Sequence, residues 1–138
     1  MLSCDKQGGI GDGYLGYIDE IAAIRDFLLQ CKGYLSQGKF DFVQRSDSVA
    51  QLIALELEVA DIPPIILELT PDHYVEGPKN DHDADRGGFV YVFGHAIEKV
   101  ELYIKLKCDP MRGCVCISFH EAKYPLRTHD EITSLFRD

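Results

Sequence analysis

Three strand-like runs lie in the second half of the chain, and apolar and polar residues alternate along the last two of them. The sequence reads FVYVFG at 89–94, VELYIKLKC at 100–108 and CVCISFH at 114–120. This period of two is typical of strands that bury one face, and turn residues separate the three runs. Asp109-Pro110 and Gly113 lie between the last two runs, so we predict a β-hairpin there.

The first half of the chain shows the spacing of amphipathic helices instead. In a first predicted helix, apolar residues recur every three or four positions, at Ile21, Ile24, Leu28, Cys31 and Leu35. Gly38 is placed to end this helix. A second helix is predicted after Ser46 or Asp47, and a third after Asp61. Their buried positions are expected at Val49, Leu52 and Ile53 and at Ile65, Ile66 and Leu69.

Helices followed by strands predict an α+β domain in which an antiparallel sheet is packed on one side by the N-terminal helices. The length of 138 residues fits one domain. Residues 1–16 are Gly-rich and lack a pattern, so we expect a disordered leader, followed by a single domain over residues 17–138.

Cysteine usage and hydropathy predict the compartment. No apolar run approaches the roughly 20 residues of a membrane helix, and the N-terminus lacks the apolar stretch of a signal peptide. The chain has five cysteines, an odd count. We therefore expect reduced thiols in a cytoplasmic protein.

Charge is distributed unevenly along the chain. The whole chain carries 14 Lys and Arg residues against 23 Asp and Glu residues, a net charge of −9. Between residues 99 and 127, six basic residues stand against three acidic ones, a local charge of +3. A basic segment in an otherwise acidic chain permits a small binding site for a polyanion. It suits contact with an acidic surface of a partner protein equally.

Pairing the last two strands through the hairpin predicts two distinct faces. The buried face is expected to hold Val100, Leu102, Ile104, Leu106, Val115, Ile117 and Phe119. The opposite face is then expected to hold Glu101, Tyr103, Lys105, Lys107, Cys116, Ser118 and His120. An imidazole, a phenol and two ammonium groups on one face suit phosphodiester chemistry. The alternative is an ordinary solvated sheet face, with His120 bonded to a backbone group at the strand end.

Metal-binding patterns are incomplete in this sequence. The loop with Asp81, Asp83 and Asp85 imitates a calcium loop, but Arg86 replaces the glycine and Val92 the glutamate. We therefore predict an acidic loop there.

The cysteines near the hairpin do not form a zinc pattern either. Strand parity places Cys108 on the opposite face from Cys114 and Cys116, and the chain has no CxxC pair. No metal or cofactor is predicted.

The order of these pieces resembles the MqsR-type toxins of bacterial toxin–antitoxin systems, which are mRNA interferases with a RelE-like fold. The family's DxY element corresponds to Asp72–Tyr74 in LTPDHYVEGP, its YIK-like strand to LYIKLK (102–107), and its closing ISF-basic element to CISFHEAKYP (116–125). The resemblance covers about residues 17–125.

Position by position, the resemblance implies catalytic roles for Tyr103, Lys105 and His120. The best-known members carry lysine where this chain has His120. The family's lysine after DxY falls on Val75, and Lys79 is the nearby basic residue that could replace it. The other residues expected to bind substrate are His73, Tyr74, Tyr91, Lys107 and Arg127.

The resemblance implies an endoribonuclease that cleaves single-stranded mRNA without a metal. In that reaction the 2′-OH attacks the adjacent phosphate and leaves a 2′,3′-cyclic phosphate. It also implies a cognate antitoxin, a small helix-turn-helix protein. Two alternatives stay open: a non-catalytic α+β module that docks an acidic partner, and a metal-assisted nuclease built on the aspartates of the acidic loop.

Overall fold

The computed structural model of the chain describes residues 9–80 and 88–128, with side chains from residue 19 onward. Its helices are α1 (Gly9–Ser36), α2 (Ser46–Ala54) and α3 (Ile62–Leu67), with short 3-10 turns η2 (Val59–Asp61) and η3 (Pro71–His73). Its strands are β1 (Phe40–Phe42), β2 (Tyr74–Asn80), β3 (Phe89–Ile97), β4 (Val100–Asp109) and β5 (Gly113–Glu121). The described chain is therefore α+β, as predicted.

The five strands form one mixed sheet in the order β1-β5-β4-β3-β2. Strands β2 to β5 are antiparallel, whereas β1 runs parallel to β5. The prediction of an antiparallel sheet is thus wrong for β1, a strand that was not predicted from the sequence. Three residues are too few to show an alternation, and their pairing partner lies more than 70 positions away.

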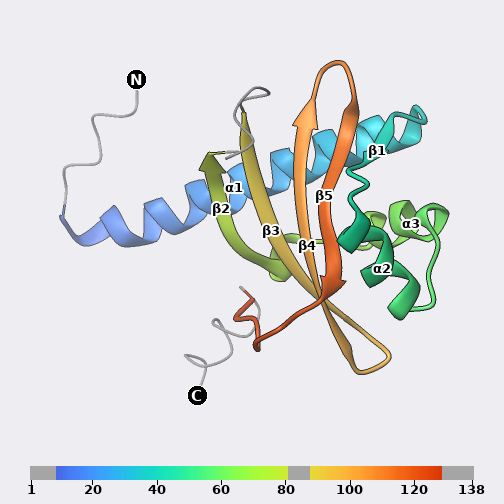
Figure 1. Ribbon diagram of the computed structural model, residues 1–138. Coiled ribbons are helices and arrows are strands. Elements are labelled where there is room, and N and C mark those ends of the chain that lie inside the picture. The colour runs from blue at the N-terminus through green and yellow to red at the C-terminus, as the bar shows by residue number, and fades with distance from the viewer. Residues whose placement is uncertain (1–8, 81–87, 129–138) are drawn as a thin grey trace.

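The helices cover one face of the sheet, which we call the core face. Figure 1 shows α1 crossing behind the strands, with α2 and α3 beside the β1 end of the sheet. The core draws buried side chains from all these layers: Ile24, Phe27, Leu28, Cys31, Phe42, Leu52, Ile62, Ile66, Leu69, Phe93, Leu102, Ile104, Leu106, Cys114, Cys116 and Phe119. We call the opposite face the open face.

Helix α1 begins earlier than the sequence predicts. It runs without interruption from Gly9, so it extends through the end of the expected leader, whose residues 1–8 lie outside the described part of the chain. Extending an existing helix fixes one residue per added hydrogen bond, which is far easier than starting a new one. Despite its 28 residues, neither α1 nor any other helix in the described chain is long and apolar enough to cross a membrane.

The second helix buries a different stripe from the predicted one. Leu52 is buried together with Ser48, whereas Val49 and Ile53 are exposed. Residues four apart lie above one another on a helix, so the Ser48–Leu52 stripe faces the sheet and its neighbours, rotated by one position, face away.

A β-bulge in β5 changes which residues reach the core. The register passes from Lys105–Ser118 to Leu106–Cys116, so Ile117 is an extra residue without a partner on β4. Beyond a bulge the alternation of side chains shifts by one position. The predicted buried face of β5 is therefore correct at Phe119, which lies in the core. It is wrong for the residues of β5 between the bulge and the hairpin turn.

Between the bulge and the turn, the residues of β5 lie on the opposite faces from those predicted, whereas the residues of β4 keep their predicted faces. Cys114 and Cys116 point into the core, while Val115 and Ile117 form a second small apolar cluster with Val90 on the open face. Cys108 is the direct partner of Cys114, so these two cysteines share a face instead of lying on opposite ones.

Candidate functional site

Tyr103 and His120 lie side by side on the open face of the sheet. They are opposed residues of β4 and β5, and their rings stack with centroids 4.9 Å apart and planes 11° apart. Their neighbours in sequence, Ile104 and Phe119, are fully buried on the core face. The predicted placement of the phenol and the imidazole is therefore confirmed.

A backbone contact selects the tautomer of His120. Its Nδ1 lies 2.9 Å from the carbonyl oxygen of Glu121. A carbonyl oxygen only accepts hydrogen bonds, so Nδ1 carries the hydrogen in this contact, and in the neutral ring Nε2 keeps its lone pair. The strand-end bond to a backbone group, which the alternative of an ordinary solvated face predicted, is thus present, and it leaves the other ring nitrogen available as a base.

Two charged residues of β2 act on Tyr103. Glu76 and Lys79 form an ion pair with an N–O distance of 2.9 Å, on either side of an irregularity in the β2–β3 register. The hydrogen bond to Glu76 raises the pKa of Lys79. The pKa of Tyr103 is raised mainly by burial, with Lys79 lowering it and Glu76 raising it. Tyr103 is therefore a protonated phenol at neutral pH.

The two lysines of β4 differ in their surroundings. Lys105 is half-buried and lies between Val92 and Ser118 on the open face. Lys107 is only 3% exposed, because it lies between Val90 and Val115 of the second apolar cluster. The bulge places Val115 beside Lys107, and the burial of this lysine does not favour the substrate contact that the resemblance implied.

The stretch after β5 turns back across the open face. The backbone N–H of Leu126 points to the Glu101 carboxylate, 3.3 Å from its nearer oxygen. A Cβ on Gly94 would lie 2.9 Å from Leu126 and 3.2 Å from Thr128. Gly94 is the partner of Tyr103 on β3, so exposed Arg127 lies one strand away from the tyrosine.

Two tyrosines predicted to bind substrate lie on the core side instead. Tyr91 packs against Phe27 of α1, with ring centroids 4.2 Å apart. Tyr74 also packs on the core, and its hydroxyl donates to the Gly77 carbonyl oxygen at 2.5 Å. Their strand partners, Phe93 and Leu106, are core residues, so neither tyrosine lies on the open face where the substrate was expected to bind. Burial, followed by the nearby Glu20 carboxylate, raises the pKa of Tyr74 to about 12.

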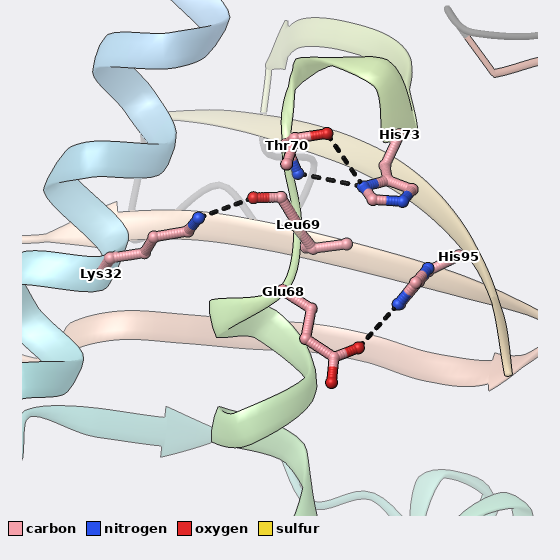
Figure 2. A network of polar contacts seen from close by, with 6 residues as sticks. All are labelled: Lys32, Glu68, Leu69, Thr70, His73 and His95. Carbon is pink, nitrogen blue, oxygen red and sulfur yellow. Dashed lines mark hydrogen bonds and ion pairs between the residues drawn. The ribbon is translucent and has the colours of Figure 1, made fainter.

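His73 lies in a separate polar network at the edge of the sheet. Thr70 donates its backbone N–H to His73 Nδ1 at 3.0 Å, and His95 Nε2 lies 2.9 Å from Glu68 Oε1; Figure 2 shows how these side chains lie. The ring centroids of His73 and His95 are 4.4 Å apart. His73 therefore belongs to this network and not to the Tyr103–His120 pair.

A cavity of about 420 Å³ opens beside this network. Its lining consists of Thr70, Asp72, His73, Gly94, His95, Ala96, Glu101 and Thr128. Gly94 and Glu101 continue the open face next to Tyr103, so the cavity adjoins the polar pair. Sequence reasoning missed His95 because its partner Glu68 is 27 positions away and no local pattern links them.

Metal ligands do not cluster in the described residues. Within 19–80 and 88–128, no group of three or more His, Cys, Asp or Glu side chains is arranged to hold a metal ion. The three loop aspartates, Asp81, Asp83 and Asp85, lie outside the described residues.

On the open face, the chain thus brings together Tyr103, His120, Lys105 and Lys79, with Glu76 as an addition that the sequence did not predict. Comparisons with protein-family models, with curated proteins and with solved structures find no match to this chain.

Proposed function

We propose that this protein is an endoribonuclease that cleaves single-stranded RNA by attack of a ribose 2′-OH on the adjacent phosphate. The observation that carries this proposal is the stacked Tyr103–His120 pair, whose histidine has one ring nitrogen anchored to a backbone carbonyl. Cleavage of a phosphodiester in this way requires one group that takes a proton from the 2′-OH and another that gives a proton to the 5′ oxygen. Two such groups lie side by side here.

His120 is the general base in this proposal. With Nδ1–H held by the Glu121 carbonyl, neutral Nε2 takes the proton from the 2′-OH. The 2′ oxygen then attacks phosphorus, the bond to the 5′ oxygen breaks, and the products are a 2′,3′-cyclic phosphate and a 5′-OH. Anchoring of the ring limits its rotation, so the lone pair is held in one direction before substrate binds.

Tyr103 is the general acid, and lysines stabilise the phosphate. The raised pKa of Tyr103 keeps its proton in place at neutral pH for the departing 5′ oxygen. Lys105 on the same face and Lys79 beside the phenol supply positive charge where negative charge develops on the phosphate oxygens. Lys79 thus takes the place of the lysine that the family carries at Val75.

The substrate is single-stranded because in-line attack needs a nucleotide turned out of its stack. The cavity next to Tyr103, lined by Gly94 and Glu101, offers space for that nucleotide. Arg127 on the returning C-terminal stretch is exposed, which supports a contact with a flanking phosphate in this proposal.

We further propose that the fold is RelE-like and that the protein is the toxin of a type II toxin–antitoxin system, acting on mRNA in the cytoplasm. Sequence order supports this proposal: the DxY, YIK and ISF-basic elements fall on η3–β2, β4 and β5 in turn. A small helix-turn-helix antitoxin would then be encoded beside it. Co-expression with that neighbour should restore growth and yield a complex.

The test is cleavage of a fluorescent single-stranded RNA in EDTA, with ribonuclease inhibitor present. Common contaminating ribonucleases leave the same ends, so His120→Ala protein, purified identically, is the essential control. We expect 5′-OH and 2′,3′-cyclic phosphate ends from the natural protein only. A single 2′-O-methyl group at the cleaved nucleotide should abolish cleavage there.

Other products would point to the alternatives. Cleavage that stops in EDTA and leaves 5′-phosphate ends would indicate a metal-assisted nuclease. Absence of cleavage with both isolated mRNA and translating ribosomes would overturn the proposal and favour a binding module.

A further inference from the structure

Four of the five cysteines converge in the core, below the β4–β5 turn. Cys31 comes from α1, Cys108 from the end of β4, and Cys114 and Cys116 from β5. The Sγ atoms of Cys31 and Cys108 are only 3.2 Å apart, although 77 positions separate the two residues. Cys114 is also near enough to Cys31 to raise the pKa of its thiol.

The contact between Cys31 and Cys108 is close to bonding distance. A disulfide has an S–S length of about 2.05 Å, so the two sulfur atoms at 3.2 Å must approach by roughly 1.2 Å. Both sulfurs already face each other across the interface between α1 and the sheet. No other partner is needed to bring them together.

The two thiols differ in exposure and in acidity. Cys108 is partly exposed, whereas Cys31 is completely buried. The hydrogen bond from Cys31 lowers the pKa of Cys108, and hydrogen bonds to Cys108 and Cys114 raise the pKa of Cys31. The thiolate is the reactive form, so Cys108 is the cysteine that an oxidant in solvent meets first.

We propose that Cys31 and Cys108 form a disulfide bond when the protein is exposed to hydrogen peroxide, with Cys108 oxidised first and Cys31 acting as the resolving thiol. The Cys108 thiolate attacks one peroxide oxygen, the O–O bond breaks, and the released hydroxide takes a proton to become water. Cys108 is then a sulfenic acid. Cys31 attacks its sulfur, the S–S bond forms, and the S–O bond breaks. The departing hydroxide takes the Cys31 proton, so two thiols are oxidised and one peroxide becomes two waters.

The bond would tie α1 to the end of β4. It closes a loop between positions 77 apart, which restricts the unfolded chain more than the folded one. The oxidised protein should therefore unfold at a higher urea concentration than the reduced protein. The Tyr103–His120 pair lies on the other face of the sheet, so this modification is independent of the proposed RNA chemistry.

The experiment treats the purified full chain with a small molar excess of hydrogen peroxide. Remaining thiols are blocked with N-ethylmaleimide, and the protein is digested without reduction for mass spectrometry. We expect the loss of two hydrogens per chain and one linked peptide pair that contains Cys31 and Cys108. Cys116→Ser, a buried cysteine outside the pair, should leave that linkage unchanged.

Trapping the intermediate tests the order of events. In Cys31→Ser protein, dimedone should label Cys108, because the sulfenic acid has no resolving partner. Cys108→Ser protein should give neither the linkage nor the label. A linkage between Cys108 and Cys114, links only between chains through Cys4, or thiols that remain reduced in the folded natural protein would each overturn the proposal. The natural protein alone distinguishes these outcomes, even if a buried serine impairs folding of a variant.

Discussion

Tyr103 and His120 are directly opposed on β4 and β5, with their rings stacked 4.9 Å apart. The pair lies beyond the bulge at Ile117, on the side away from the hairpin turn. Without that extra residue, the same two strands could not have both Phe119 and Cys116 in the core. The bulge therefore lets one strand bury its thiols near the turn and still present His120 beside the tyrosine.

Replacing His120 with alanine should remove RNA cleavage and leave the fold intact. Loss of a general base lowers rates by about 10²- to 10⁴-fold. Loss of the cross-strand ring contact should cost about 1 kcal/mol or less in the free energy of unfolding. Cleavage rate, urea unfolding and growth arrest on expression are the measurements, with exposed Lys123→Ala as the matched control. Full toxicity from a well-folded His120→Ala protein would remove His120 from the mechanism.

Replacing Tyr103 with phenylalanine keeps the stacked ring and removes only the hydroxyl. We expect kcat to fall by roughly 10²-fold or more with little change in KM, because the proton donor acts in the transition state. The raised pKa of Tyr103 means that its proton is lost only above its ordinary value of about 10. Cleavage by the natural protein should therefore show no decline from Tyr103 between pH 8 and about pH 10. An equal rate in Tyr103→Phe would assign the acid to another group.

Stability should fall as the pH rises from about 10 to 12. An unfolded tyrosine ionises near pH 10, whereas the pKa of Tyr74 in the folded protein is about 12. Between these values the folded state holds a proton that the unfolded state has lost, so stability decreases with pH. The urea midpoint at several pH values measures this, and Tyr74→Phe should make the decline shallower. The raised pKa values of Tyr91 and Tyr103 act in the same direction. An unchanged slope in Tyr74→Phe would show that Tyr74 does not contribute.

Replacing Gly113 with alanine should destabilise the protein by about 3 kcal/mol or more. Gly113 has a φ of +88°, and a Cβ there would overlap the carbonyl oxygen of Lys39. The new methyl group would separate β1 from β5. Gly33→Ala is the matched control, since its Cβ position in α1 has no atom within 4 Å apart from its chain neighbours and the backbone of its own helix. It should stabilise by about 0.5–1 kcal/mol, and chemical denaturation of both variants should show opposite shifts.

The β3–β4 turn should tolerate glycine better than its present residues. Glu98 and Lys99 form a two-residue hairpin loop with φ values of 51° and 72°. Residues with a Cβ adopt positive φ values at a cost in free energy, and two-residue hairpin turns of this kind prefer Asn-Gly. Glu98→Asn combined with Lys99→Gly should raise stability by about 1 kcal/mol, measured as a higher urea midpoint at constant m. A lower midpoint would mean that the long side chains stabilise the turn more than the backbone strain costs.

The sequence by itself predicted what depends on local periodicity. Three long strands, the first helix and the hairpin that joins β4 to β5 are all present, and Tyr103 and His120 share one face of the sheet, as predicted. Apolar spacing and the turn residues that bound each run are local signals, so these elements could be inferred from their own residues. The short strand β1 and the broken strand β2 lacked such a pattern.

The tertiary structure decided everything that depends on one extra residue or on a distant partner. The Ile117 bulge exchanged the two faces near the turn, buried Lys107, and moved Cys114 and Cys116 into contact with the core. Register is a cumulative property, so one unpaired residue reverses every assignment beyond it. The pairing of Cys31 with Cys108 depends on α1 packing against the end of β4. Packing of this kind is settled by the shapes of both surfaces together, and neither stretch of sequence carries that information alone.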